Sequence, residues 1–178
     1  MPIYLGFGAN QGDIPGTFAS ALAALEPALE PLTISSLYRS APVVRPGGYA
    51  EPQAPYNNLV VRGFASPQEH PPERLLRWTQ EVEKTAGRQP HGSLDAPRPL
   101  DIDLLLYGDQ IVAGQDLTVP HPRMHQRRFV LAPLQELAPD LKIPSLGLSV
   151  SDLLASLAAD GDWVERVPTP GALSRWRG

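Results

Sequence analysis

The segment from Leu100 to Tyr107 constrains the fold more than any other part of the chain. It is a strongly apolar run, interrupted only by Asp101 and Asp103, which are two residues apart. Side chains alternate between the two faces of a strand, so both carboxylates point the same way while leucine and isoleucine cover the other face. Aspartate is depleted in strands, and like charges on one face repel. The segment predicts a central strand whose aspartate pair can hold two metal ions; a solvated face with two functionless aspartates is the alternative.

The elements around this segment predict an α+β fold. Their order is strand, helix, strand, strand, helix, strand, which is the split βαβ arrangement of ferredoxin-like sheets. We expect a ferredoxin-like (βαββαβ) antiparallel sheet with helices packed on it, additional C-terminal elements, and one domain over residues 1–178. The predicted strands are residues 3–7, 32–40, 58–64 and 100–107. One helix follows Asp13 and Pro15 with the apolar stripe Phe18, Ala21, Leu22, Leu25 and Leu29, and the other follows Pro72 and stops at Gly87.

The residues after Tyr107 predict shorter elements. A turn at Gly108-Asp109 leads the fourth strand into a hairpin partner at residues 110–112. A short helix is expected over residues 130–137. Ser149 and Asp152 resemble a capping box, which predicts a last helix over residues 153–159.

Composition excludes several classes of protein and site. The chain has no cysteine, so any metal is held by oxygen or imidazole, and oxygen ligands favour magnesium or manganese. A net charge of −4 gives no footprint for nucleic-acid binding. No apolar run approaches the length of a membrane span, and the first residues lack the features of a signal peptide. We therefore expect a cytoplasmic, monomeric protein that binds neither nucleic acid nor a membrane.

Basic residues gather within forty positions of the aspartate pair. Arginine fits phosphate oxygens bidentately and histidine adds a donor, so cations beside a metal site indicate a polyphosphate substrate. An ordinary basic surface is the alternative for any single arginine. A zinc site on the histidine pair would need a third ligand and a continuous helix, which Pro122 disfavours. The residues are Arg88, Arg98, His121, Arg123, His125, Arg127 and Arg128.

The first strand runs into a glycine-rich stretch that imitates a dinucleotide fingerprint. The stretch Gly6-Phe-Gly-Ala-Asn-Gln-Gly has its third glycine one residue late, and the second strand ends in Tyr38-Arg39-Ser40 rather than an acid. We interpret it as a turn that needs small residues. The chain contains no G-x-x-x-x-G-K-[ST] loop, so any use of ATP does not involve a P-loop.

Four segments resemble the 6-hydroxymethyl-7,8-dihydropterin pyrophosphokinase family of folate synthesis. They are Tyr4-Leu-Gly-Phe-Gly-Ala-Asn-Gln-Gly-Asp, Tyr56-Asn-Asn-Leu-Val-Val, Pro97-Arg-Pro-Leu-Asp-Ile-Asp-Leu-Leu-Leu-Tyr-Gly and Val119-Pro-His-Pro-Arg-Met. Their order and spacing hold from about Ile3 to Pro139. The resemblance implies a ferredoxin-like core, ATP, two Mg²⁺ ions, and attack of the pterin hydroxyl on the β-phosphorus with release of AMP.

The resemblance also implies residue roles. Arg88, Arg98, Asp101 and Asp103 would be catalytic, with both aspartates binding the metal ions. The ATP site would consist of Gln80, Glu83, Arg88, Arg98, Leu104, Leu117, Thr118, His121 and Arg127. The pterin site would consist of Ser40, Pro42, Val43, Tyr56, Asn58 and Phe129.

This sequence departs from the family at three places. The loop over residues 89–96 lacks the aromatic residue that some members carry, Ala96 stands where glycine is usual, and Pro122 stands where an aromatic can occur. The long polar loops over residues 41–55 and 88–96 are expected to be mobile without ligand. Two other functions remain open: a two-metal phosphotransferase or nucleotidyltransferase with a different acceptor, and a ferredoxin-like ligand-binding module without activity.

Overall fold

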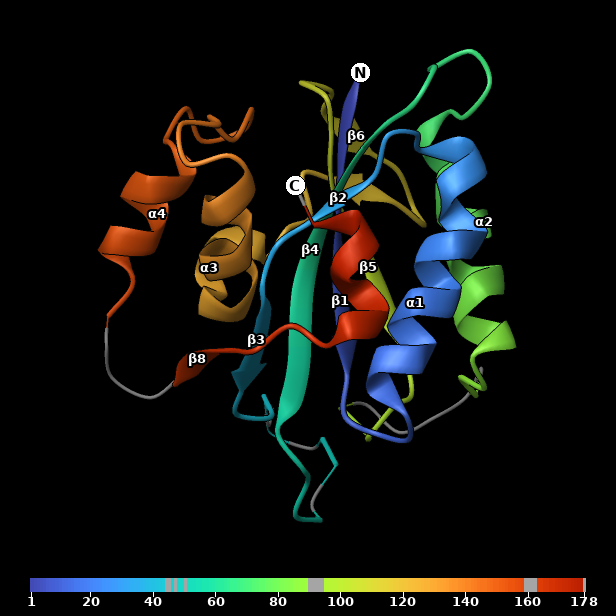
Figure 1. Ribbon diagram of the computed structural model, residues 1–178. Coiled ribbons are helices and arrows are strands. Elements are labelled where there is room, and N and C mark those ends of the chain that lie inside the picture. The colour runs from blue at the N-terminus through green and yellow to red at the C-terminus, as the bar shows by residue number, and fades with distance from the viewer. Residues whose placement is uncertain (44–45, 47, 50, 90–94, 159–162, 178) are drawn as a thin grey trace.

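One β-sheet with helices on both faces makes up the fold. The computed structural model of the chain describes residues 1–43, 46, 48–49, 51–89, 95–158 and 163–177, so parts of the two long polar loops lie outside the described residues. Helices α1 (Ile14–Leu25) and α2 (Pro72–Thr85) cover one face of the sheet, and α3 (Arg128–Leu137) and α4 (Val150–Ser156) lie on the other side (Figure 1). Among the described helices, none has the length and apolar character that crossing a membrane requires.

The sheet is antiparallel, with strand order β5-β1-β4-β3-β8 and with β2 also paired to β4. This order confirms a mixed α and β fold built on an antiparallel sheet. The strands are β1 (Pro2–Ala9), β2 (Thr33–Ile34), β3 (Leu37–Ser40), β4 (Tyr56–Phe64), β5 (Asp101–Tyr107) and β8 (Val164–Val167).

The prediction that the aspartate-bearing strand is central is wrong, because β5 lies at one end of the strand order. Its side chains are nevertheless buried from Leu104 to Tyr107. Helices pack on both faces of the sheet, and the segment at His121 follows the outer edge, where its backbone N–H donates to Leu105 O at 2.9 Å. Burial of an apolar strand therefore does not require a strand on each side.

The predicted strand over residues 32–40 is interrupted at Ser35 and Ser36, which separate β2 from β3. Ser35 donates its backbone N–H to Val60 O at 2.9 Å, and its hydroxyl accepts the Val60 N–H at 3.0 Å. A side-chain hydroxyl thus takes the place of a backbone carbonyl in the ladder, which is the competition with sheet pairing that serine introduces.

The two helices before β5 begin as their sequences predict, but the first ends earlier than its apolar stripe suggested. Asp13 accepts the Gly16 N–H at 3.2 Å as the cap of α1. The stripe is buried from Phe18 to Leu25, where α1 ends, and Leu29 is buried after the 3₁₀ turn η1 (Glu26–Ala28). Helix α2 follows Pro71, and Gly87 after its end has a φ of 93°. That left-handed conformation costs glycine little, so Gly87 ends the helix as expected.

The region after β5 differs from the prediction in two respects. Strand β6 (Val112–Ala113) pairs with β7 (Thr118–Val119) in a separate two-stranded sheet, so the expected hairpin with β5 is wrong. Ser149 accepts the Asp152 N–H at 3.0 Å, which confirms the capping box. The helix begins at Val150, directly after the cap, rather than at residue 153, because a capping box occupies the first turn. Residue 159, its predicted end, lies outside the described part.

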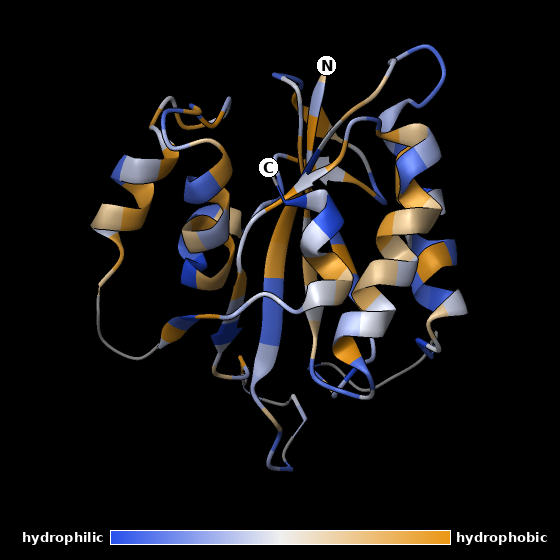
Figure 2. Cartoon of the chain, in the orientation of Figure 1, coloured by the Kyte–Doolittle hydropathy of each residue, from blue (hydrophilic) through white to orange (hydrophobic). Residues whose placement is uncertain are grey.

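Two apolar cores lie on opposite faces of the sheet. One joins the sheet to α1, α2 and the C-terminal 3₁₀ helix η3 (Gly171–Trp176), and the other joins it to α3 and α4. Apolar and polar residues both occur along these helices (Figure 2), and apolar residues of α1, α2 and α3 are buried. The sheet face toward α3 is open at the end where β1 finishes and β5 begins, and the polar residues of the sequence motifs gather there.

Candidate active site

Gly6 and Gly8 of β1 form the floor of a cavity of about 280 Å³. Gly8 lies opposite Asn58 of β4 and Asp101 of β5, so the three residues face the same side of the sheet. A Cβ atom at Gly8 would lie 3.5 Å from Asn58 Oδ1 and 4.0 Å from Asp101 Cβ. The missing side chains therefore leave space between a polar strand and an acidic strand. The glycine-rich stretch acts through its strand residues rather than as a dinucleotide fingerprint.

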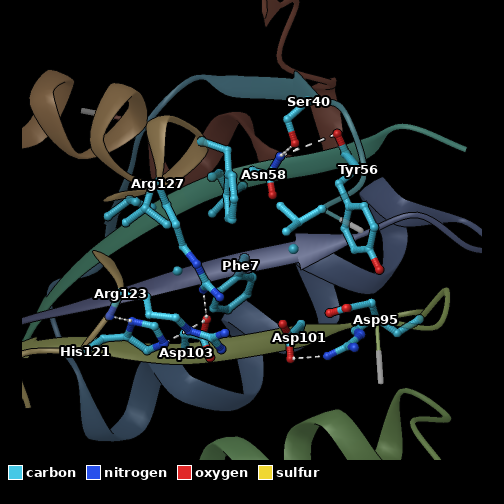
Figure 3. A pocket seen from close by; sticks show the side chains of 18 of the residues that line it. Phe7, Ser40, Tyr56, Asn58, Asp95, Asp101, Asp103, His121, Arg123 and Arg127 are labelled. Atoms are coloured by element: carbon cyan, nitrogen blue, oxygen red, sulfur yellow. Dashed lines mark hydrogen bonds and ion pairs between the residues drawn. The ribbon is translucent and has the colours of Figure 1, made fainter. Parts of the chain in front are cut away.

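Asp101 and Asp103 both face this cavity, as strand alternation predicted (Figure 3). Their side chains are 28% and 36% exposed. Burial and, secondarily, the charge of Asp101 raise the pKa of Asp103 to about 6, against the opposing effect of nearby arginines. A cation bound beside Asp103 would offset the cost of ionising this carboxyl.

Three arginines surround the aspartates. Arg88 and Arg98 each place a guanidinium nitrogen on Asp101 Oδ1, at 2.8 Å and 3.1 Å. Arg127 lies 3.4 Å from Asp103 Oδ2. A guanidinium fork matches phosphate oxygens as well as it matches carboxylates. The arginines that hold the aspartates are therefore placed to bind a polyphosphate beside them.

His121 contributes a neutral imidazole to the same wall. Its Nδ1 accepts the Arg123 N–H at 3.2 Å, so the neutral ring carries its proton on Nε2, 3.7 Å from Asp103 Oδ2. Burial, reinforced by the charges of Arg127 and Arg123, lowers the His121 pKa to about 4. At neutral pH the ring is thus an uncharged hydrogen-bond donor directed toward the acidic strand.

The fit of a metal ion to these residues depends on the two aspartates. Within the described ranges, no group of three or more histidine, aspartate and glutamate side chains is arranged to hold a metal ion. A zinc site on His121 and His125 therefore has no third ligand there. Magnesium commonly takes one or two carboxylates and completes its coordination with water and substrate phosphates. Asp101 and Asp103 fit that pattern of ligands.

The other half of the cavity is formed by aromatic and amide side chains. Asn58 is buried and donates from Nδ2 to Ser40 Oγ at 2.9 Å. Tyr56 donates its hydroxyl to Ala96 O at 3.3 Å, and Phe129 lies in the first turn of α3 with the Arg127 guanidinium carbon 5.5 Å from its ring centroid. Aromatic faces next to a buried amide suit a flat, hydrogen-bonding heterocycle.

Glu83 lies behind the acidic strand rather than in the cavity wall. It reaches from α2 to β5, accepts the Ile102 N–H at 2.6 Å and contacts the Arg88 guanidinium. Burial raises the Glu83 pKa to about 7, despite the lowering effects of these contacts. Its position fixes Arg88 against Asp101.

The structure brings eleven of the predicted site residues into the cavity wall. They are Ser40, Val43, Tyr56, Asn58, Arg88, Arg98, Asp101, Asp103, His121, Arg127 and Phe129. The other six do not line it. Glu83 lies behind β5, Gln80 is exposed on α2, and Thr118 is exposed in β7. Leu104 and Leu117 are buried in the core beside α1 and α2, and Pro42 is half-buried.

Arg123, one of the basic residues expected near a polyphosphate, also lines the cavity. Sequence reasoning assigned no role to three further residues in or near the site. Asp95 lines the cavity. Asn10 and Gln53 lie beside it and hold its loops. The position of Asn10 directly after a glycine-rich strand was the available signal, but its contacts lie more than 40 residues away in the sequence.

Comparison with known proteins identifies a family resemblance over most of the chain. Residues 4–139 match the family model described as 7,8-dihydro-6-hydroxymethylpterin-pyrophosphokinase. A Bacillus subtilis 2-amino-4-hydroxy-6-hydroxymethyldihydropteridine pyrophosphokinase is 38% identical over 136 residues, covering 75% of this chain and 76% of its own. The Aquifex aeolicus protein of that name is 36% identical over 142 residues, covering 80% of this chain and 83% of its own.

Longer proteins also contain a similar region. The Dictyostelium discoideum folic acid synthesis protein FOL1 is 29% identical over 168 residues, which are 94% of this chain but 24% of that protein. The Plasmodium falciparum HPPK-DHPS structure with STZ-DHP superposes with a TM-score of 0.67 at 14% identity, over 86% of this chain and 42% of that one. The matched region therefore makes up about a quarter of the Dictyostelium protein and less than half of the Plasmodium chain. At 14% identity, the second comparison shows a similarity of fold alone.

Proposed function

The chain belongs to the 7,8-dihydro-6-hydroxymethylpterin-pyrophosphokinase family, and on this premise we propose that it transfers pyrophosphate from ATP to 6-hydroxymethyl-7,8-dihydropterin. The observation that carries the proposal is the two-sided cavity. Asp101, Asp103 and their arginines form one side, and Asn58 with two aromatic rings forms the other. A site of this kind accommodates a polyphosphate and a flat heterocycle side by side.

In this reaction the pterin hydroxymethyl oxygen bonds to the β-phosphorus of ATP. The bond from that phosphorus to the oxygen leading to the α-phosphate breaks, AMP leaves, and the hydroxyl loses its proton. Two magnesium ions, held by Asp101 and Asp103, would neutralise phosphate charge and align the reacting oxygens. Catalysis of this type depends on positioning and charge stabilisation more than on a base.

We assign the residues to roles according to their placement. Arg88, Arg98 and Arg127 bind phosphate oxygens, and His121 donates from Nε2 to the same groups. Arg98 would meet the charge that develops as AMP departs, because it lies against Asp101, which would hold a metal ion beside the phosphates. At the other end, Asn58 pairs with the pterin edge.

The strand arrangement supports the ferredoxin-like description of the core. Taking β2 and β3 together as the second strand, the order along the sheet is fourth, first, third, second, with every neighbouring pair antiparallel. The two crossovers contain α1 and α2, which lie on one face (Figure 1). The chain adds β8 and η3 after this core.

Identification of the products by mass tests the proposed reaction. The protein, ATP, magnesium and the pterin alcohol should give AMP and the pterin diphosphate ester in equal amounts. Formation of ADP with a pterin monophosphate would show a different phosphotransferase. No turnover, with nucleotide binding unaffected by magnesium, would indicate a ligand-binding module. If Asp103→Ala is tested in the same assay, Asp109→Ala is its control, because it removes one negative charge at an exposed position in a turn.

A further inference from the structure

A buried amide, Asn10, follows directly on the last residue of β1. Only 8% of Asn10 is exposed. Its Nδ2 donates to Gln53 Oε1 and to Ala54 O, each at 3.2 Å. Its Oδ1 accepts the Arg98 N–H at 2.9 Å, and its backbone N–H donates to Arg98 O at 3.1 Å. Both side-chain hydrogens and the side-chain oxygen are thus used.

These contacts join three loops that are distant in sequence. Gln53 and Ala54 lie just before β4, 43 and 44 residues from Asn10 in the sequence, and Arg98 lies 88 residues from Asn10, just before β5. Gln53 extends the connection, because its Nε2 donates to Asp95 O at 2.8 Å. The amide therefore connects the loop that enters the pterin-binding strand to the loop that enters the acidic strand.

The backbone before β5 is fixed at three residues by this set of side chains. Gln53 holds Asp95 O, Tyr56 holds Ala96 O, and Asn10 holds both the N–H and the carbonyl of Arg98. Figure 3 shows Tyr56 on the side of the cavity next to Asp95. With its backbone held, Arg98 places its NH1 3.1 Å from Asp101 Oδ1.

We propose that Asn10 is a positioning residue, which aligns Arg98 with the transferred phosphates and ties that alignment to the pterin-binding loop. The proposal rests on the proposed function for its catalytic consequence, whereas the contacts themselves do not. Asparagine suits the position because it combines two donors with an acceptor in one small planar group. Aspartate would keep the acceptor for Arg98 and lose both donors, and alanine would lose all three.

A purely structural role for Asn10 makes different predictions. It would lower the melting temperature and act independently of Arg98. A positioning role lowers the rate of the chemical step because small displacements of a charged group cost on the order of 10²-fold in rate. If Asn10 acts by positioning Arg98, the effect of replacing Asn10 on the rate should also disappear when Arg98 is absent. A double-mutant cycle measures this dependence.

The experiment combines amide exchange with single-turnover kinetics. In Asn10→Ala, NMR-detected exchange of the Arg98 amide without ligands should accelerate about tenfold or more, because its acceptor is lost. In Asn10→Asp, which retains the acceptor, that amide should stay protected, and this variant serves if the alanine variant does not fold. The control Gln11→Ala changes an exposed neighbour and should alter neither measurement.

The single-turnover rate of Asn10→Ala should fall on the order of 10- to 100-fold, with the ATP dissociation constant changed less than about threefold. In an Arg98→Ala background the same change should cost less than about twofold. Equal losses in both backgrounds, or an Arg98 amide that stays protected in Asn10→Ala, would overturn the proposal. If the unaltered protein forms no AMP, the proposed function fails, while amide exchange still decides whether Asn10 holds Arg98.

Discussion

The titration of Glu83 should make the protein less stable as the pH rises. Glu83 is 5% exposed, and its carboxyl lies between the Ile102 N–H and the Arg88 guanidinium. Burial exceeds the effect of both contacts and raises the pKa of Glu83 from its ordinary 4.5 to about 7. In the unfolded chain the carboxyl returns to its ordinary pKa, so folding and proton binding are linked.

The sign and size of the effect follow from those two pKa values. Between pH 4.5 and about 7, the folded protein keeps a proton on Glu83 that the unfolded chain has lost. The contribution of Glu83 to stability is therefore complete below pH 4.5 and is lost as the pH approaches 7. Since one pKa unit corresponds to about 1.4 kcal/mol, the loss amounts to about 3 kcal/mol.

Urea unfolding of the protein and of Glu83→Gln, in buffers from pH 4 to pH 8 with a chelator, measures this loss. The unfolding free energy of the unaltered protein, minus that of the variant, should fall by about 3 kcal/mol over this range. Asp103 and His121 titrate in both proteins, so their effects cancel in the difference. Glu81→Gln, an exposed change on the same helix, should give a flat difference. A flat or rising difference for Glu83→Gln would refute the reasoning.

Three further predictions concern the cavity. Asp103→Ala should nearly abolish turnover, because it removes a metal ligand. It should not lower the melting temperature, because burial opposes the ionisation of the carboxylate that is removed. Near-normal activity in magnesium would disprove the metal assignment. Arg98→Ala should lower the single-turnover rate on the order of 10²–10³-fold and ATP affinity only mildly, with poor rescue by lysine; an unchanged rate with a large affinity loss would make it a binding residue only. Gly8→Val should fold normally and lose pterin affinity in calorimetry, because its methyl groups would enter the space between the strands; unchanged affinity would place the pterin elsewhere.

The parts of the site that were predictable are those set by local periodicity. Asp101 and Asp103 face one side because strand side chains alternate, and this holds wherever the strand lies in the sheet. The position of β5 at the edge was not predictable in the same way, because its burial comes from helices and from the segment at His121. An apolar run reports how much of a strand is covered, but not which kind of element covers it.

The roles of Glu83 and Asn10 show the limit of local reasoning more sharply. Glu83 fits the apolar face of α2 by its spacing, and only the docking of that helix on β5 reveals that it binds a backbone N–H and Arg88. Asn10 has no helical or strand period to mark it. Its chemistry depends on loops that approach from residues 53 and 98.

The glycine-rich stretch shows both a local sequence pattern and contacts that depend on distant segments. Small residues after a strand indicate that a ligand or another part of the chain approaches the backbone closely, and a dinucleotide bound at a helix N-terminus is one such ligand. Here the register decides otherwise: Gly6 and Gly8 lie between β4 and β5, so the vacant side-chain positions open the sheet face itself. Asn10 then resumes side-chain contacts where the strand ends, and uses them to hold Arg98 at the rim of the space that the glycines leave. One pentapeptide therefore both opens the cavity and aligns a cation at its edge.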